Sequence, residues 1–234
     1  MNFESELISG LFIKRYKRFF VDIKIKNQII VAHCPNSGSM LNLLDKGNPV
    51  WLTKSNNEKR KLKYSLQIIK SKGRKFGVNT HLANKIMLEA LQRKKIEELS
   101  KFDIIKPEQK FGTKTRFDFL LENTSLKKKA YLEVKNVTLN RNRDLAEFPD
   151  AVTTRGKKHL DDLAIAKIKG FESYIIYLVQ IENCKQFSIA YDIDPQYFEA
   201  FKEAKKKGVK ILCYDCKFND KGIEINKKID LLNE

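Results

Sequence analysis

The chain has 234 residues, 42% of them hydrophobic and 32% charged, which is enough for one large or two small globular domains with a buried core. Its 46 lysines and arginines against 29 aspartates and glutamates give a formal net charge of +17. This charge argues against an ordinary neutral metabolic enzyme and favours a polyanionic partner, either nucleic acid or an anionic membrane surface. No apolar run approaches the roughly 20 residues of a membrane-spanning helix, and the N-terminus lacks a signal-peptide pattern. We therefore expect a cytoplasmic protein with reduced cysteines and no membrane partner.

The first third of the chain is basic and rich in β-forming residues. Residues 1–75 contain 16 lysines and arginines against 5 acidic residues. Turn signals separate the four strands that we expect, at residues 19–25, 28–33, 48–54 and 61–70. Short strands at this spacing predict a small barrel of the OB type, a common nucleic-acid platform. A solvated lysine-rich face without a partner explains the charge about equally well.

Cations mixed with an aromatic ring mark the predicted nucleic-acid contacts of this first part. Basic side chains around a stacking ring such as Tyr16 are typical of a groove for single strands. Asn36 and Ser39 lie in a turn of small polar residues that can hold a phosphate, or that simply joins two strands. The predicted contacts are Lys14, Arg15, Tyr16, Arg18, Asn36, Ser39, Arg60 and Lys61.

After about residue 78 the sequence alternates between helical and strand patterns. We expect a helix from Asn79 or Thr80 to Leu99, a strand pair, a helix, a buried strand, a helix and a final strand. The expected ranges after the first helix are 116–121, 130–134, 156–169, 173–181, 195–207 and 209–214. This order predicts an α/β or α+β domain with a mixed sheet. We place the boundary within residues 71–78, which gives domains of residues 1–77 and 78–234.

The expected strand pair contains three residues suited to phosphodiester chemistry. Glu133 and Lys135 are two positions apart and share one face of their strand, while a hairpin turn brings Asp118 beside Glu133. Two neighbouring carboxylates repel each other unless a cation lies between them. Mg²⁺, or Mn²⁺ in its place, suits two carboxylates with water and phosphate oxygens. A pair of surface residues is the alternative, because Glu-x-Lys triplets are frequent in so charged a chain.

The whole sequence resembles the sugar fermentation stimulation protein family. The stretches that carry the resemblance are IKRYKRFFVDI at 13–23, VAHCPNSGSM at 31–40, VWLTKS at 50–55, VNTHLAN at 78–84, TRFDFLL at 115–121, YLEVKNVTL at 131–139, FPDAVTTRGKKHL at 148–160 and IDPQYFEAF at 193–201. The resemblance implies an N-terminal OB-like barrel followed by a PD-(D/E)xK nuclease-like mixed-sheet domain. It also implies non-specific DNA binding and a regulatory role in sugar metabolism.

For the metal site, the resemblance implies that Asp118 and Glu133 are ligands and that Lys135 is the catalytic lysine. We add the carbonyl of Val134 as a third ligand. Nucleases of this class often take a further acid from the first helix, a place that Glu89 matches, and Glu108 before the hairpin is another candidate. Alternatively, Glu89 is an ordinary exposed helix residue and Glu108 an ordinary loop residue.

The stretch at 148–160 reads as a loop that enters a helix. The free N–H groups of the first turn favour a phosphate. Arg155 and His159 are four residues apart and therefore share a face, with Lys158 beside them. These three residues are predicted to clamp nucleic acid near the metal site, and a capped amphipathic helix is compatible with the same pattern.

Three functions remain open from the sequence. The first is a Mg²⁺-dependent nuclease that grips DNA through backbone contacts, with binding that weakens steeply with salt. The second is a regulator, nucleoid-associated or not, that uses a nuclease fold only to bind DNA. The third is RNA binding or RNA processing, which suits an OB-type barrel equally well. A homodimer is compatible with each of them.

Overall fold

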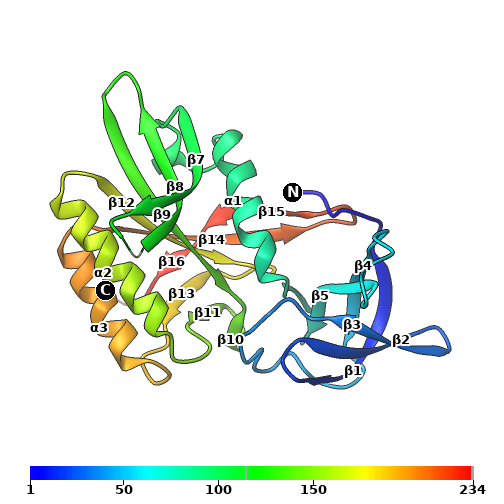
Figure 1. Cartoon of the computed structure of the whole chain (residues 1–234). Helices are drawn as coiled ribbons and strands as arrows, with labels where there is room; N and C mark the ends of the chain where they lie inside the picture. Colours follow the sequence, from blue (N-terminus) through cyan, green and yellow to red (C-terminus); the bar gives the residue numbers. More distant parts are fainter. Residues whose placement is uncertain (114, 233–234) are drawn as a thin grey trace.

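The N-terminal part of the chain forms a closed five-stranded barrel. The computed structural model describes residues 1–113 and 115–232. The strands of this part are β1 (Ile8–Tyr16), β2 (Phe20–Ile25), β3 (Gln28–His33), β4 (Pro49–Lys54), β5 (Tyr64–Ser71) and β6 (Arg74–Gly77). Strands follow one another in the order β3-β2-β1-β4-β5, and a pairing between β3 and β5 closes the ring (Figure 1). This is the OB topology, so the predicted barrel is confirmed.

The rest of the chain builds a mixed sheet with helices on both faces. Its helices are α1 (Ala83–Gln92), α2 (Thr154–Ile168) and α3 (Pro195–Lys206). Its main sheet has the order β15-β14-β12-β9-β8-β7, made of β7 (Ile104–Phe111), β8 (Thr115–Asn123), β9 (Lys128–Val137), β12 (Glu172–Val179), β14 (Lys210–Phe218) and β15 (Ile223–Lys228). The central β9, β12 and β14 are parallel. A smaller sheet contains β10 (Leu139–Asn142), β11 (Leu145–Phe148), β13 (Gln186–Ile189) and β16 (Asp230–Leu231).

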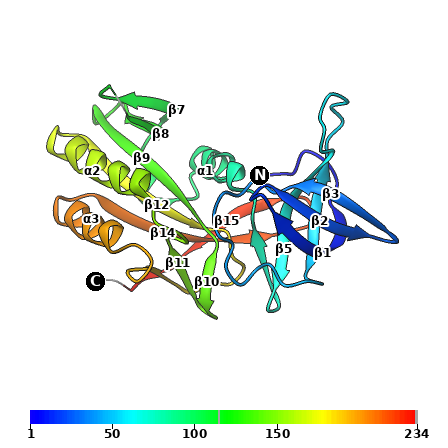
Figure 2. The same ribbon diagram turned by 60° about the horizontal axis from the view of Figure 1, so that its bottom comes forward.

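The alternation of side chains along β9 divides the core into two layers. Leu132 and Val134 pack with Ile86 of α1, whereas Tyr131 packs in the cluster that contains Leu160 of α2. Helices α2 and α3 lie side by side over that second face (Figure 2). Residues of odd number in β9 therefore face α2, which places Glu133 and Lys135 on that side.

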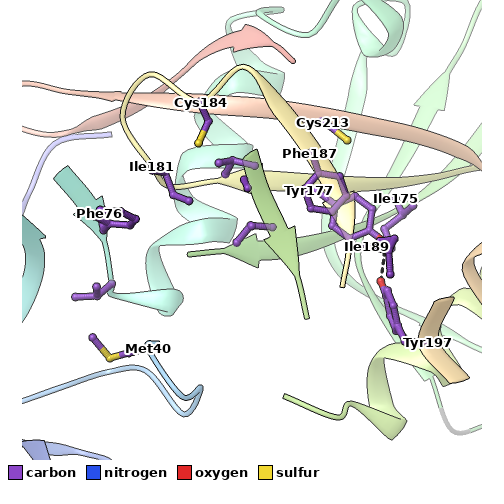
Figure 3. Close-up of a cluster of buried hydrophobic side chains, with 14 of the residues drawn as sticks. Met40, Phe76, Ile175, Tyr177, Ile181, Cys184, Phe187, Ile189, Tyr197 and Cys213 are labelled. Carbon is purple, nitrogen blue, oxygen red and sulfur yellow. Dashed lines mark hydrogen bonds between the residues drawn. The ribbon is translucent and has the colours of Figure 1, made fainter. Parts of the chain in front are cut away.

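A buried aromatic cluster anchors α3 and the small sheet to β12. The rings of Tyr177 and Phe187 stack with their centroids 4.3 Å apart. The hydroxyls of Tyr177 and Tyr197 share a hydrogen bond of 2.6 Å, which satisfies two polar groups inside the core (Figure 3). Because β12 is hydrophobic on both faces, it reads in the sequence as a continuous apolar run, as expected for a central parallel strand.

The barrel and the mixed-sheet domain are joined by backbone hydrogen bonds as well as by the chain. Phe76 of β6 forms a bridge with Ile181, and the amide of Gly77 donates to the carbonyl of Gln180 at 2.8 Å. A Cβ atom on Gly77 would lie 2.3 Å from Oε1 of Gln180, so a larger residue here would displace that side chain. At the other end, Asn2 pairs with Gly222 at the turn between β14 and β15. None of the described helices has the length and apolarity needed to cross a membrane.

The structure contains several elements that the sequence did not lead us to expect, among them β6, β15 and the small sheet of β10, β11, β13 and β16. Three further differences have a local physical reason. Residues 8–16 form β1, although we expected the first strand only after the basic cluster. The helix expected over 79–99 is a 3-10 turn (Thr80–Leu82), then α1, then a second turn (Glu97–Leu99), because Lys94 adopts a positive φ of 51°. The edge strand β7 was not expected because it contains Pro107, a residue that sheets tolerate at edges.

Candidate active site

Asp118 and Glu133 lie on adjacent strands where the ladder between β8 and β9 ends. The last backbone pair joins Phe119 to Leu132. One residue further, Oδ2 of Asp118 accepts a hydrogen bond of 2.8 Å from the amide of Val134, so a side chain takes the place of a main-chain acceptor. The carboxylate of Asp118 is thereby fixed against β9, next to the residues that follow Glu133.

Asn84, in the first turn of α1, holds the other oxygen of the same carboxylate. Its Nδ2 donates to Oδ1 of Asp118 at 2.7 Å. Each oxygen of Asp118 therefore has one donor, and each keeps a lone pair free for a further partner. The side chain is oriented by two separate elements, β9 and α1, before any ligand arrives.

Glu133 is buried, with 3% of its surface exposed, and only one of its oxygens has partners. Oε1 accepts from Nζ of Lys135 at 2.8 Å and contacts Nδ1 of His159. Oε2 is buried and has no hydrogen-bond partner among residues 1–113 and 115–232. A buried carboxylate oxygen without a partner is costly, and in native proteins it often marks a site for an ion or a water.

The two acids have pKa values that move in opposite directions. Burial, reinforced by the charge of Glu133, raises the pKa of Asp118 from 3.8 to about 6. Burial also acts to raise the pKa of Glu133, but Lys135 and His159 outweigh it and the pKa is lowered. Glu133 is therefore ionised, and its negative charge resists the ionisation of Asp118. Lys135 supplies one positive charge for two carboxylates, so the site keeps a net negative charge when both acids are ionised, and a metal ion would offset it.

The donor set suits a small hard cation that keeps part of its hydration shell. Within residues 1–113 and 115–232, no group of three or more histidines, cysteines, aspartates and glutamates could hold a metal by itself. Mg²⁺ is usually bound by one or two carboxylates, with waters and substrate phosphates completing the octahedron. Asp118 and the unpartnered Oε2 of Glu133 match that requirement.

The two additional acids predicted as ligands have other partners in the structure. Glu89 of α1 accepts from the amino group of Met1 at 2.8 Å and pairs with Arg93 at 3.1 Å. Glu108 is exposed on the edge strand β7 and pairs with Arg116 at 3.1 Å. Neither carboxylate joins the contacts described for Asp118 and Glu133.

Helix α2 brings one of its three predicted residues directly to the site. His159 is buried beside Glu133, and its Nε2 accepts from Nε of Arg155 at 3.5 Å. Its Nδ1 contacts Oε1 of Glu133 and lies 3.4 Å from Nζ of Lys135, so the imidazole joins the same polar cluster. Arg155 is exposed at the helix start, while Lys158 pairs with Asp162 at 2.6 Å and contacts Thr115.

In the barrel, the 36–39 loop is held from both sides. The guanidinium of Arg15 donates to the carbonyls of Asn36 at 2.6 Å and Gly38 at 2.9 Å. Asn36 is 3% exposed and donates to the carbonyl of Val78, and Ser39 donates to the carbonyl of Asp150 at 3.0 Å. These residues brace the loop against the second domain, which leaves their polar groups largely committed.

The remaining predicted contacts of the barrel are more available to a partner. Lys14 has a side chain 66% exposed, 3.6 Å from Asp22, and its Nζ lies over the ring of Tyr16. Tyr16 stacks on Phe20 with centroids 5.7 Å apart. Arg18 and Lys61 are exposed. Arg60 donates to the hydroxyl of Ser65 at 2.6 Å.

Sequence reasoning missed Asn84, which is the residue of α1 that contacts the site. An asparagine near a helix start is explained by capping alone, so its type gives no functional signal. The stretch VNTHLAN at 78–84 was the available indication, because it contributed to the family resemblance.

Comparisons with known proteins agree along the full chain. The family model described as "SfsA N-terminal OB domain" matches residues 13–78, and that described as "Sugar fermentation stimulation protein RE domain" matches residues 81–222. The chain is 54% identical over 233 residues to a sugar fermentation stimulation protein homolog of Pelagibacter ubique, covering 100% of both chains. It is 41% identical to the homolog of Pseudoalteromonas atlantica, covering 99% of this chain and 100% of that one.

A solved structure has the same fold at lower identity. The structure of Pyrococcus furiosus SfsA in complex with Ca²⁺ matches with a TM-score of 0.88 and 24% identity, covering 99% of this chain and 98% of that one. The predicted order of an OB barrel and a mixed-sheet domain is thus found in a relative. With both family models matched in order and homologous sequences aligned end to end, the chain belongs to the sugar fermentation stimulation protein family.

Proposed function

We propose that the protein binds DNA through its barrel and hydrolyses phosphodiester bonds with a divalent metal, Mg²⁺ or Mn²⁺, at Asp118 and Glu133. The observation that carries the proposal is the unpartnered, buried Oε2 of Glu133 beside a second carboxylate whose pKa is raised to about 6. Such a pair is unfavourable in a purely structural role, because the single ammonium of Lys135 leaves two neighbouring buried acids with a net negative charge when both are ionised. A protein that only gripped DNA would have no need of it.

Each residue has a task that follows from its contacts. Asp118, Glu133 and the carbonyl of Val134 would hold the cation, which when bound supplies Lewis-acid stabilisation and lowers the pKa of water. Asn84 keeps the carboxylate of Asp118 in place. Lys135 donates to Glu133 at 2.8 Å, and the same ammonium orients an attacking water and stabilises negative charge on the phosphate. His159 holds Glu133 from the side of α2.

The charge distribution supports a polyanionic substrate. The chain carries a formal net charge of +17, much of it in the barrel, and exposed cations such as Lys14, Arg18 and Lys61 flank it. Binding through them is expected to be insensitive to sequence and to weaken as salt rises, because it releases counterions. The cytoplasm remains the predicted location, and all four cysteines are free and buried thiols. We retain residues 1–77 and 78–234 as the proposed domains.

Cleavage of labelled DNA by Lys135→Ala and wild-type protein tests the proposal. We expect Mg²⁺- or Mn²⁺-dependent cleavage by the wild type and a loss of about 100-fold or more in the variant, since removing one group that stabilises transition-state charge typically has that effect. DNA affinity should change little. Lys157→Ala, on the outer side of α2 in an ion pair with Asp161, is a matched control. Binding without turnover in any divalent metal would instead identify a DNA-binding regulator, and preferential cleavage of RNA would identify an RNA-processing enzyme.

A further inference from the structure

A polar cavity, separate from the candidate active site, lies between the barrel and the start of α1. Its volume is about 340 Å³, within the roughly 300–1,000 Å³ of small-molecule sites. The barrel contributes side chains from β3, β4, β5 and the 55–63 loop, the start of α1 contributes the opposite side, and residues 1–4 form a third wall. Asp118, Glu133 and Lys135 do not line it.

The inner part of this cavity is a connected set of neutral hydrogen-bonding groups. Asn79 donates to Oε1 of Gln67 at 2.8 Å, and Gln67 donates to the hydroxyl of Thr53 at 2.8 Å. Gln67 is 4% exposed and Ser65 is 7% exposed. Polar side chains buried to this degree and linked to each other form a rigid surface that can present donors to a ligand.

Four cationic or protonatable side chains line the same cavity: His33, Arg60, His81 and Lys85. Arg60 donates to Ser65 at 2.6 Å, which aims its guanidinium inward. Burial, with the charges of Arg60 and His81, lowers the pKa of His33, so these groups act on one another. Lys85 pairs with Glu4 at 3.0 Å, but the side chain of Glu4 is 84% exposed, and such a surface pair is weak. Positive groups crowded around a polar cavity favour an anion of more than one charge.

The cavity adjoins the candidate active site through one turn of helix. His81 and Lys85 line the cavity, and Asn84 between them donates to Asp118. These three residues lie within five positions at the start of α1, where a helical turn rises about 5.4 Å. The start of α1 is thus shared by the cavity and the candidate active site.

We propose that this cavity binds the terminal phosphate of a nucleic-acid strand, so that the protein engages strand ends beside its metal site. The inference rests on the proposed function, whose substrate class it specifies. A terminal phosphate carries about −1.5 to −2 charge near pH 7 and has three acceptor oxygens. An internal phosphodiester carries a single negative charge, so the positive charges of Arg60 and Lys85 favour the end of a strand over its interior. Arg60 supplies the forked donors that phosphate oxygens accept best.

Fluorescence anisotropy with single-stranded oligonucleotides tests the inference. The strands carry a 5′-phosphate, a 3′-phosphate or hydroxyls at both ends, and the titrations use metal-free buffer to prevent cleavage. We expect the wild type to bind one phosphate-ended strand about tenfold more tightly than the hydroxyl-ended strand, the scale of one charge-assisted contact. Arg60→Ala and His81→Ala should lose this preference. Lys59→Ala, an exposed neighbour of Arg60 with the same loss of charge, should retain it.

The outcomes separate this inference from the proposed hydrolysis. Equal affinity of the wild type for all three strands, or an equal loss in Lys59→Ala, would overturn it, even if metal-dependent cleavage is found. A mononucleotide that binds as tightly as the phosphate-ended strand would also overturn it, because the ligand would then be a free nucleotide. A preference that persists in a protein without any cleavage activity would support the strand-end site and contradict the hydrolysis. Unfolding curves matched to the wild type confirm that each variant is folded.

Discussion

Replacement of Asp118 by asparagine tests the electrostatics of the candidate metal site without nucleic acid. In the folded protein the pKa of this carboxyl rises from 3.8 to about 6, mainly through burial and then through Glu133. The folded state therefore holds the proton more tightly than the unfolded state, and stability falls as pH rises from about 4 to about 6. The full penalty is at most about 3 kcal/mol at 1.36 kcal/mol per pKa unit. The part of this penalty that appears between about pH 5 and pH 8 is about 1.4 kcal/mol.

The Asp118→Asn variant removes this titration but keeps the size of the side chain. Asparagine has a single acceptor oxygen, so it cannot accept from both Asn84 and the amide of Val134 as Asp118 does. The lost hydrogen bond costs about 1 kcal/mol at every pH. The diagnostic quantity is therefore the difference in pH dependence between the two proteins. Titration of other groups, such as His33 with its lowered pKa, contributes equally to both and cancels.

Urea unfolding followed by circular dichroism at pH 5 and pH 8, in chelator, measures this difference. We expect the wild type to lose about 1.4 kcal/mol more than Asp118→Asn on going to the higher pH. A divalent cation at 100 times its dissociation constant should then stabilise the wild type by about 2.7 kcal/mol at pH 8, and the variant by much less. Identical pH slopes, or equal stabilisation of both proteins by the metal, would refute the assignment of Asp118 to a cation site.

Three further variants test how the site and the barrel loop are held. In Asn84→Ala, Oδ1 of Asp118 loses its donor, so we expect a loss of about 1 kcal/mol of stability in urea unfolding. The pKa of Asp118 should also rise further, which makes stability depend more steeply on pH. An unchanged pH dependence of stability would contradict the role of Asn84. In Arg15→Ala, three carbonyls of the 36–39 loop lose their donor, and we expect about 2 kcal/mol of destabilisation. The side chain of Lys14 is 66% exposed, so Lys14→Ala should instead weaken DNA binding and reduce its salt dependence, with stability changed by under about 0.5 kcal/mol. Equal stability of Arg15→Ala and Lys14→Ala would show that Arg15 does not brace the loop.

The strand pair of the candidate site was predictable because its pattern is local. Strands β8 and β9 cover residues 115–123 and 128–137, and both expected strands fall inside them. The period of two then fixes which residues share a face, so Glu133 and Lys135 were expected together and their atoms lie 2.8 Å apart. The hairpin fixes the register, which is why Asp118 could be placed beside them.

Contacts that depend on long-range packing could not be predicted from local sequence patterns. His159 contacts Glu133 only because α2 packs on the odd-numbered face of β9, and a histidine pattern carries no such information. Arg15 lies in β1, whose alternation is interrupted by a bulge between Phe12 and Lys14, so it was read as part of a basic segment before the first strand. In the structure, the guanidinium of Arg15 holds the 36–39 loop by donating to its carbonyls, including that of Asn36.

In the proposed function, charge gives the barrel and the site separate roles. Two carboxylates and one ammonium leave the site of Asp118, Glu133 and Lys135 negative when all three are ionised, so without a cation it repels a phosphodiester. The cations of the barrel, in a chain of net charge +17, then supply the attraction. A bound divalent cation reverses the sign of the site, so metal and nucleic acid strengthen each other's binding by the same factor. Asp118→Asn, which removes one negative charge, is accordingly expected to bind DNA in chelator at least as tightly as the wild type while losing the coupling to metal.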